Sequence, residues 1–257
     1  MRGAGLVAFF AAGVPLGDGS CLNVVVDRMT VITQGTARAR HIAIAAALLI
    51  ASTSGAEDVH LITHRQIAAV TNLESAGWLV RPERASEEHP DQALDAIGIQ
   101  EGTTVADVGA GAGYFTWRVA ERVGIHGVVF GEDIQAGMLD QLWRNARARG
   151  LSNVRVVLGT AEDPKLPRGS IDVALLVNVY HEFAEPEKML EHIREALKPQ
   201  GRLVIVEYRA EDPNVPVRAE QKMTLGDLRS EVQAEGFVFE RVNEVLPRQH
   251  IVIFRKP

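Results

Sequence analysis

The stretch that decides the fold lies at residues 105–113 and reads Val-Ala-Asp-Val-Gly-Ala-Gly-Ala-Gly. The apolar and β-branched residues at 104–108 predict a short strand. Glycines follow at every second position, Gly109, Gly111 and Gly113, and residues 114–123 have the pattern of a helix. Glycines between a strand and a helix permit a tight turn and let a ligand approach the backbone closely. These residues therefore predict a ligand-binding turn at the carboxyl end of a strand.

The chain from residue 87 onward alternates helices and strands around this turn. Helices are predicted over 87–97, 114–123, 136–149 and 186–197, and another begins after Thr224, which is followed three residues later by Asp227. Strands are predicted over 104–108, 127–130, 154–158, 173–177, 202–208, 237–242 and 250–254. Such alternation predicts a parallel sheet with helices on both faces. The last two strands lack a connecting helix and should pair antiparallel. We therefore expect an α/β, Rossmann-like fold whose seven-stranded sheet is mostly parallel, with one antiparallel strand near its edge.

The composition is that of an ordinary globular protein, with 46% hydrophobic and 23% charged residues. The net charge of −6 argues against a general nucleic-acid or anionic-membrane binder, because such proteins carry a basic excess. Cys21 is the one cysteine, which excludes an intrachain disulfide and a cysteine-based zinc site. His60 and His64 are four residues apart but have no third ligand at a typical spacing, so no metal site is predicted.

The first 56 residues differ from the rest and are predicted to be an N-terminal extension with a signal peptide. Met29 to Arg40 provide a positive flank, residues 41–51 an apolar core, and Ser54 and Ala56 small residues before a cleavage point. This pattern predicts translation from Met29 and export to the periplasm or beyond. The alternative is a loosely packed N-terminal helix of a cytoplasmic protein. The apolar run is too short for a stable membrane span. Residues 57–86 then form a lead-in segment, and residues 87–257 the main domain.

Asp107 selects among the ligands that a glycine-rich turn can bind. A dinucleotide fingerprint has a Gly-x-Gly-x-x-Gly spacing, whereas here Tyr114 stands in the place of the third glycine. Asp107 lies two positions before Gly109, where it would repel a pyrophosphate. S-adenosylmethionine carries a sulfonium and an α-amino group and no phosphate, so the carboxylate favours this ligand. The alternative is that Asp107 only caps the turn.

The next two predicted strands also end in residues suited to an adenosyl ligand. Glu132 and Asp133 end the second strand, where a carboxylate can accept both ribose hydroxyl protons. Dinucleotide enzymes share this feature, so it indicates an adenosyl group without selecting the cofactor. Small residues after the third strand, around Thr160 and Ala161, can let an adenine lie against the backbone, although any loop can contain them.

Taken together, these segments resemble the class I S-adenosylmethionine-dependent methyltransferases. The resemblance covers residues 87–256 and includes the glycine-rich motif with Tyr114-Phe115, Asp133-Ile134, the loop from Gly159 to Pro167, Gly169-Ser170-Ile171-Asp172, and Leu197-Lys198-Pro199-Gln200-Gly201, in which Gln200 replaces a glycine of the family pattern. Within the family the chain looks most like a bacterial small-molecule-type subgroup, on the residues Asn178-Val179-Tyr180-His181-Glu182-Phe183, Glu207-Tyr208-Arg209 and Leu246-Pro247-Arg248-Gln249-His250.

The resemblance implies a Rossmann-like methyltransferase fold, S-adenosyl-L-methionine as cofactor, and a role for each matching position. The methionine part would be held by Asp107, Gly109, Ala110, Gly111 and Gly113, the ribose by Asp133, the adenine by Thr160, Ala161 and Glu162, and the sulfonium end by Asn178. Asp133 is preferred to Glu132 for the ribose because an aspartate directly before Ile134 matches the family register. Glu132 is then expected to be a solvated carboxylate at the strand end.

The predicted reaction is methyl transfer to an unidentified small or medium-sized acceptor. The enzyme has to align a nucleophile, dry the site and, for some acceptors, remove a proton. Tyr180, His181 and Glu182 follow the fourth strand, and His181 is the candidate base. The alternative is that Tyr180 and His181 only wall the pocket; Glu207 and Tyr208 are weaker candidates of the same kind.

Two other functions remain open from the sequence, an NAD(P)-dependent oxidoreductase and a non-catalytic adenosyl-binding module. No aromatic-basic stripe predicts a nucleic-acid partner, and the sequence does not indicate the oligomeric state.

Overall fold

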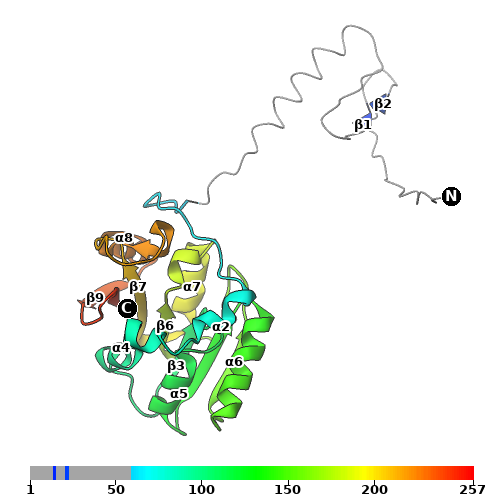
Figure 1. Cartoon of the computed structure of the whole chain (residues 1–257). Coiled ribbons are helices and arrows are strands. Elements are labelled where there is room, and N and C mark those ends of the chain that lie inside the picture. The colour runs from blue at the N-terminus through cyan, green and yellow to red at the C-terminus, as the bar shows by residue number, and fades with distance from the viewer. Residues whose placement is uncertain (1–13, 16–20, 23–58) are drawn as a thin grey trace, which may run out of the picture. The chain divides into compact units, whose positions relative to one another are not determined.

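The computed structural model describes residues 14–15, 21–22 and 59–257, and Figure 1 shows how their elements are arranged. In the N-terminal unit, β1 (Val14–Pro15) pairs antiparallel with β2 (Cys21–Leu22). The predicted signal peptide at 29–56 lies outside the described residues, as does most of the extension at 1–56. Residues 59–257 belong to a second compact unit, which contains both the lead-in segment and the main domain.

The second unit is built on one eight-stranded sheet in the order β5-β4-β3-β6-β7-β10-β9, with β8 pairing on β7. Its strands are β3 (Thr104–Val108), β4 (Val128–Asp133), β5 (Val154–Leu158), β6 (Ile171–Val177), β7 (Leu197–Arg209), β8 (Lys222–Met223), β9 (Val238–Asn243) and β10 (Gln249–Arg255). All neighbours pair parallel except that β10 runs antiparallel to both β7 and β9. The predicted mostly parallel sheet with one reversed strand near its edge is confirmed. The predicted count of seven strands is wrong, because β8 is too short to show a periodic pattern.

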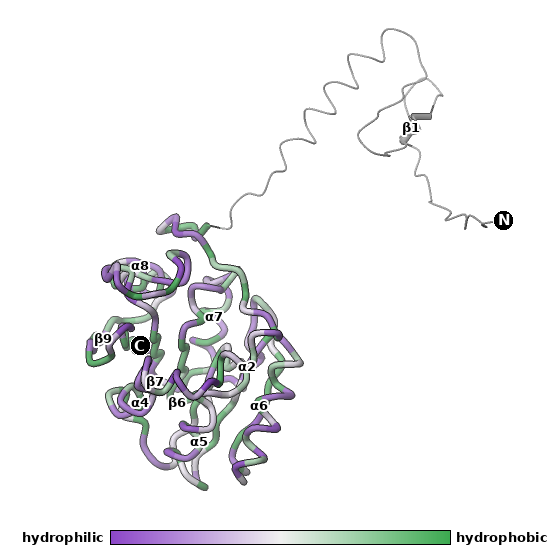
Figure 2. Tube along the Cα trace, viewed as in Figure 1, coloured by the Kyte–Doolittle hydropathy of each residue, from purple (hydrophilic) through white to green (hydrophobic). Residues whose placement is uncertain are grey.

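Helices cover both faces of this sheet (Figure 1). They are α4 (Pro90–Ile97), α5 (Thr116–Val123), α6 (Ala136–Ala148), α7 (Pro186–Ala196) and α8 (Leu225–Ala234). One apolar core contains the inner residues of α4 and α5, and a second contains those of α7 and α8. In Figure 2 hydrophilic and hydrophobic residues alternate along α6, whose buried face consists of Met138, Leu139, Leu142 and Ala146. Of the helices that the structure describes, none combines the length and apolarity needed to cross a bilayer.

The segment predicted as one helix over 87–97 is two helices, α3 (Arg84–Glu88) and α4. They meet at His89, whose backbone is left-handed with φ 48° and ψ 56°. The cause is Pro90, because a residue before proline is disfavoured in the right-handed helical region and proline itself suits the first turn of a helix.

The lead-in segment contains a 3₁₀ turn, η1 (Leu73–Ser75), and the short helix α2 (Ala76–Leu79) before it enters α3. Its course is tied to the main domain by hydrogen bonds. The backbone N–H of Ala68 donates to the carbonyl of His181 at 2.9 Å, and the Gln135 side chain donates to the carbonyl of Thr71 at 2.8 Å. Two further 3₁₀ turns, η2 (Tyr180–Glu182) and η3 (Ala219–Gln221), lie after β6 and before β8. The lead-in segment therefore reaches the carboxyl ends of the strands, where the predicted site lies.

Candidate functional site

A pocket opens at the carboxyl ends of β3, β4 and β6 and is walled on its outer side by the lead-in segment. The chain leaves β3 toward β4 on one side and later returns to β6 on the other, so the pocket lies at the point where strand order reverses. Nine of the residues predicted for the site line it: Asp107, Gly109, Ala110, Gly111, Asp133, Ala161, Asn178, His181 and Glu182. Four do not: Gly113, Thr160, Glu162 and Tyr180.

The backbone and the surroundings of the glycine-rich turn after β3 favour glycine at its key positions. Gly109 has φ +67° and Gly111 has φ +54°, both in the left-handed region. A Cβ on Gly109 would clash with the Val179 side chain, and one on Gly111 would lie 3.2 Å from Leu79 Cδ1. Gly113 has a different role, because a Cβ there would lie 2.8 Å from Leu142 Cγ of α6. The first two glycines shape the pocket, and Gly113 lets α6 pack closely against the turn.

Asp107 is a buried carboxylate at the inner end of this turn, with a side chain only 2% exposed. Thr116 Oγ1 donates a hydrogen bond to Asp107 Oδ2 at 2.6 Å. Burial raises the pKa of Asp107 to about 7, although the Thr116 hydrogen bond and the charge of Arg84 oppose the shift. Asp107 forms no ion pair with any described residue. A buried carboxylate that lines a pocket without a cationic partner fits an ammonium or sulfonium ligand.

Asp133 and Glu132 both lie at the end of β4, and the environment of Glu132 differs from the one that the sequence predicts. Asp133 Oδ2 accepts from the Gly111 N–H at 2.9 Å and Asp133 Oδ1 from the Gln135 N–H at 2.8 Å. Glu132 is 1% exposed, so its expected role as a solvated carboxylate is wrong. Its Oε2 accepts from the Gly109 N–H at 3.3 Å, and burial raises its pKa to about 8. Both carboxyl groups therefore stabilise the glycine-rich turn by accepting hydrogen bonds from its backbone N–H groups.

The loop after β5 contributes less to the pocket than the resemblance implies. Ala161 lines the pocket. Thr160 instead shapes the loop, since its Oγ1 accepts from the Asp163 N–H at 3.1 Å. Glu162 is exposed and pairs with Lys188 on α7 at 3.0 Å. Of the three residues predicted to contact the adenine, only Ala161 lines the pocket.

Asn178, directly after β6, connects the pocket to the lead-in helix α3. Its backbone is left-handed, with φ +51°, and its Nδ2 donates to Glu88 Oε2 at 3.2 Å. The other oxygen of Glu88 accepts from the Tyr208 hydroxyl at 3.0 Å and from Arg84 Nε at 2.9 Å. Asn178 Oδ1 is buried without a hydrogen-bond partner among the described residues. Sequence reasoning missed Arg84 and Glu88; their spacing of four within a charged segment was the available signal.

His181 is held by a carboxylate on the neighbouring strand. Its Nδ1 lies 2.8 Å from Oε2 of Glu207, a fully buried residue of β7. Because a carboxylate only accepts, Nδ1 carries a proton and Nε2 is the free lone pair of the neutral ring. Nε2 has no hydrogen-bond partner among the described residues and lies 3.8 Å from Glu182 Oε1. Burial lowers the pKa of His181, but the charges of Glu207 and Glu182 outweigh it, so the pKa is raised.

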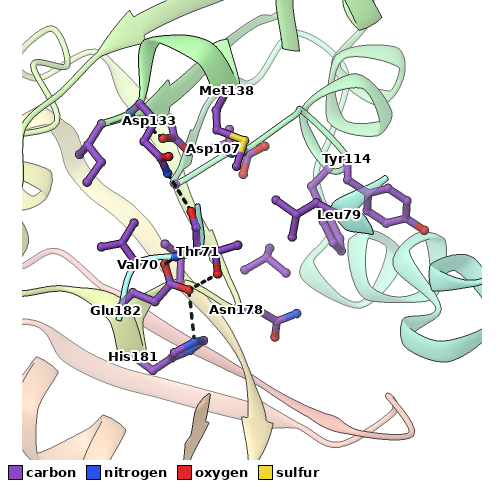
Figure 3. A pocket seen from close by; sticks show the side chains of 18 of the residues that line it. Val70, Thr71, Leu79, Asp107, Tyr114, Asp133, Met138, Asn178, His181 and Glu182 are labelled. Carbon is purple, nitrogen blue, oxygen red and sulfur yellow. Dashed lines mark hydrogen bonds and ion pairs between the residues drawn. The ribbon is translucent and has the colours of Figure 1, made fainter. Parts of the chain in front are cut away.

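Glu182 and Tyr180, the other two catalytic candidates, have mainly structural contacts. Glu182 accepts from the Thr71 backbone N–H at 3.0 Å and from Thr71 Oγ1 at 2.6 Å, which fastens the lead-in segment over the pocket. Figure 3 shows Thr71 meeting Glu182 beside His181, with Asp107 and Asp133 lying apart from them. Tyr180 is fully buried, and its ring packs edge-on against Phe183 at 5.5 Å between centroids. Tyr180 thus belongs to the core below the pocket.

A protein-family model described as a methyltransferase domain matches residues 99–243. The chain is 32% identical over 155 residues to a nocamycin O-methyltransferase of Saccharothrix syringae, a match that covers 60% of this chain and 53% of the relative. It is 32% identical over 116 residues to the ubiquinone/menaquinone biosynthesis C-methyltransferase UbiE of Idiomarina loihiensis, covering 45% of this chain and 46% of the relative. The chain therefore spans about half the length of these curated relatives.

Among solved structures, the chain is similar to an S-adenosylmethionine-dependent methyltransferase from Aquifex aeolicus. The TM-score is 0.70 and the sequence identity 27%, and the match covers 73% of this chain and 100% of that one.

Proposed function

Because the chain belongs to the class I S-adenosylmethionine-dependent methyltransferase family, we propose that it methylates a small or medium-sized acceptor that loses a proton in the reaction. The observation that carries this proposal is the His181 imidazole, which lines the same pocket as the buried carboxylate of Asp107 and whose Nε2 has no hydrogen-bond partner among the described residues. The relatives' names include an O- and a C-methyltransferase. The proposal therefore states that the acceptor loses a proton and does not name the atom that is methylated.

The cofactor of this family fits the residues present. Asp107 would face the ammonium group, Asp133 the ribose hydroxyls, Ala161 the adenine and Asn178 the sulfonium end. Bound S-adenosylmethionine supplies a methyl group that is already activated by the positive sulfur. Gly109 and Gly111 let the turn pack closely against Val179 and Leu79, because a side chain at either glycine would meet one of them. The negative lining of the pocket suits a cation and disfavours a pyrophosphate, which supports this cofactor over NAD.

Within the proposed reaction, His181 acts as general base. Nε2 accepts the proton of the acceptor, and the imidazolium that results is stabilised by Glu207 at 2.8 Å from Nδ1. The raised pKa of His181 makes it a stronger base but also means that it is neutral only above that pKa. The apolar residues Val70, Leu79 and Phe183 line the same pocket and exclude water from it.

Two experiments test the proposal. Calorimetry with S-adenosylhomocysteine and with NAD should give binding of the first alone; binding of NAD without S-adenosylhomocysteine would contradict the cofactor assignment. Incubation with methyl-labelled S-adenosylmethionine and a small-molecule extract of the host, followed by mass spectrometry, should show a labelled product. Binding of S-adenosylhomocysteine with no labelled acceptor would favour a non-catalytic adenosyl-binding module.

We also propose that residues 29–56 direct export of the chain. The support is the sequence pattern of positive flank, apolar core and small residues before position 57. Because S-adenosylmethionine is made in the cytosol, an exported enzyme would need a separate supply. N-terminal sequencing of the protein from its host should give a mature chain that begins at Glu57; a mature chain beginning before Met29 would contradict the proposal.

A further inference from the structure

The charges that line the pocket are strongly unbalanced. Five carboxyl groups face it, and the lining residues include a single permanent cation, Arg84; the carboxyl groups are those of Glu88, Asp107, Glu132, Asp133 and Glu182. His181 is the other basic side chain. An anionic group of a ligand in this pocket therefore has Arg84 as its natural partner, because the ionised carboxylates among the lining residues would repel it.

Arg84 is held in place on three sides and remains open on one. Its Nε donates to Glu88 Oε1 at 2.9 Å, and its Nη1 donates to the Leu79 carbonyl at 2.8 Å. The guanidinium lies over the Tyr114 ring, 4.4 Å from its centroid. Nη2 donates to no described residue, although the side chain is only 7% exposed. A guanidinium has five donors in a rigid fork, so Arg84, which lines the pocket, keeps unused donors.

Glu88 neutralises the positive charge of Arg84 only in part. Its carboxylate is shared among three donors, because it also accepts from the Tyr208 hydroxyl at 3.0 Å and from Asn178 Nδ2 at 3.2 Å. Arg84 also acts on Asp107, since its positive charge opposes the rise in the pKa of that carboxyl. A carboxylate without an ion pair and a guanidinium with unused donors thus line the same pocket. The two side chains complement an amino acid zwitterion, in which the ammonium and the carboxylate are bonded to the same α-carbon.

We propose that Arg84 binds the α-carboxylate of the cofactor's methionyl end, whose ammonium group the proposed function places at Asp107. This inference rests on the proposed function and extends it. It places part of the cofactor site in the lead-in segment, before residue 99, where the family match begins. The family resemblance assigned no residue to this carboxylate, and the buried Arg84 supplies one.

The test compares two ligands that differ only in the carboxylate, S-adenosylmethionine and its decarboxylated form, by calorimetry on the full chain. The wild-type protein should bind S-adenosylmethionine about 10-fold to 100-fold more tightly, the range for a charged hydrogen bond. In Arg84→Gln this ratio should fall to about 1 because the affinity for S-adenosylmethionine alone decreases. Arg84→Lys keeps the charge beside Glu88 and should retain part of the ratio.

The matched control is Arg118→Met. Arg118 is also buried and also lies over the Tyr114 ring, at 4.1 Å, but it does not line the pocket. This variant should keep the wild-type ratio. An equal loss of affinity for both ligands in Arg84→Gln would show a purely structural role and overturn the proposal. Equal binding of both ligands by the wild-type protein would overturn it as well and leave the proposed function intact, whereas binding of neither would contradict the proposed function itself.

Discussion

His181 Nδ1 and Glu207 Oε2 are 2.8 Å apart across the ends of two neighbouring elements, η2 after β6 and the strand β7. Glu207 has no solvent exposure, and the backbone N–H of His181 also donates to its Oε1 at 3.3 Å. The carboxylate thereby fixes both the tautomer and the orientation of the imidazole. If His181 is the base, Glu207 is the residue that positions it.

Replacement of Glu207 by glutamine should therefore act through His181. Without the negative charge, the pKa of His181 should fall, and the acidic limb of the pH–rate profile should move to lower pH. The rate constant kcat should decrease about 100-fold at neutral pH, because the imidazolium loses its counter-charge. The KM for S-adenosylmethionine should not change. The measurement is kcat against pH for the wild type and for Glu207→Gln.

A His181→Gln variant is the companion experiment for that profile. It should lose about as much activity as Glu207→Gln, and the double variant should lose no more than either single one, because the two residues act as a unit. Strictly additive losses would show that Glu207 does not act through His181.

Cofactor affinity should depend on the ionisation of Asp107. Its pKa is raised to about 7, so the carboxyl is largely protonated below that pH and cannot pair with an ammonium group. The affinity for S-adenosylhomocysteine should therefore increase as the pH rises from 6 to 8. Asp107→Asn should weaken binding by about 10-fold to 100-fold at pH 8 and remove this pH dependence. Calorimetry across the pH range measures both effects; an Asp107→Asn variant with wild-type affinity would remove Asp107 from the site.

Stability should decrease as the pH rises through the range in which Glu132 titrates. An unfolded glutamate loses its proton near pH 4.5, whereas burial raises the pKa of Glu132 in the folded chain to about 8. Between these values the folded state binds a proton that the unfolded state has released, so the free energy of unfolding falls with increasing pH. Glu132→Gln, which mimics the protonated side chain, should match the wild type near pH 5 and be more stable near pH 9 by about 1 kcal/mol or more. Urea unfolding at the two pH values tests this; equal differences at both would contradict it.

The lead-in segment should loosen when Thr71 loses its hydroxyl. Thr71 Oγ1 donates to Glu182 Oε1 at 2.6 Å, and Thr71→Val keeps the shape of the side chain but leaves that oxygen of Glu182 without its donor. The expected cost is about 1–3 kcal/mol of unfolding free energy. Amide hydrogen exchange should accelerate over residues 68–79 while the amides of β3 and β6 stay protected.

The strands and the glycine-rich turn were predictable because their signals are local. The apolar run at Thr104–Val108 predicts the strand, and the glycines that follow predict the turn, all within ten residues. Asp107 was placed correctly in the pocket by the same local register. The two-residue strand β8 was not predictable, since its pairing with Tyr208 and Arg209 depends on where the sheet ends.

The misread residues have contacts that are distant in the sequence. Glu132 looked like a surface carboxylate, yet it is covered by the turn at Gly109, 23 residues earlier. Thr71 meets Glu182 across 111 residues, and Tyr208 meets Glu88 across 120. No periodic pattern within a helix or strand carries such pairings, so the contribution of the lead-in segment to the site could be found only in three dimensions.

The lead-in segment also bears on how this chain compares with its relatives. The floor of the pocket is encoded within residues 99–243, which the family model matches, but the outer wall with Thr71, Leu79 and Arg84 is encoded upstream of it. Two proteins that are alike over the matched domain can thus differ in the wall that closes the pocket on its outer side.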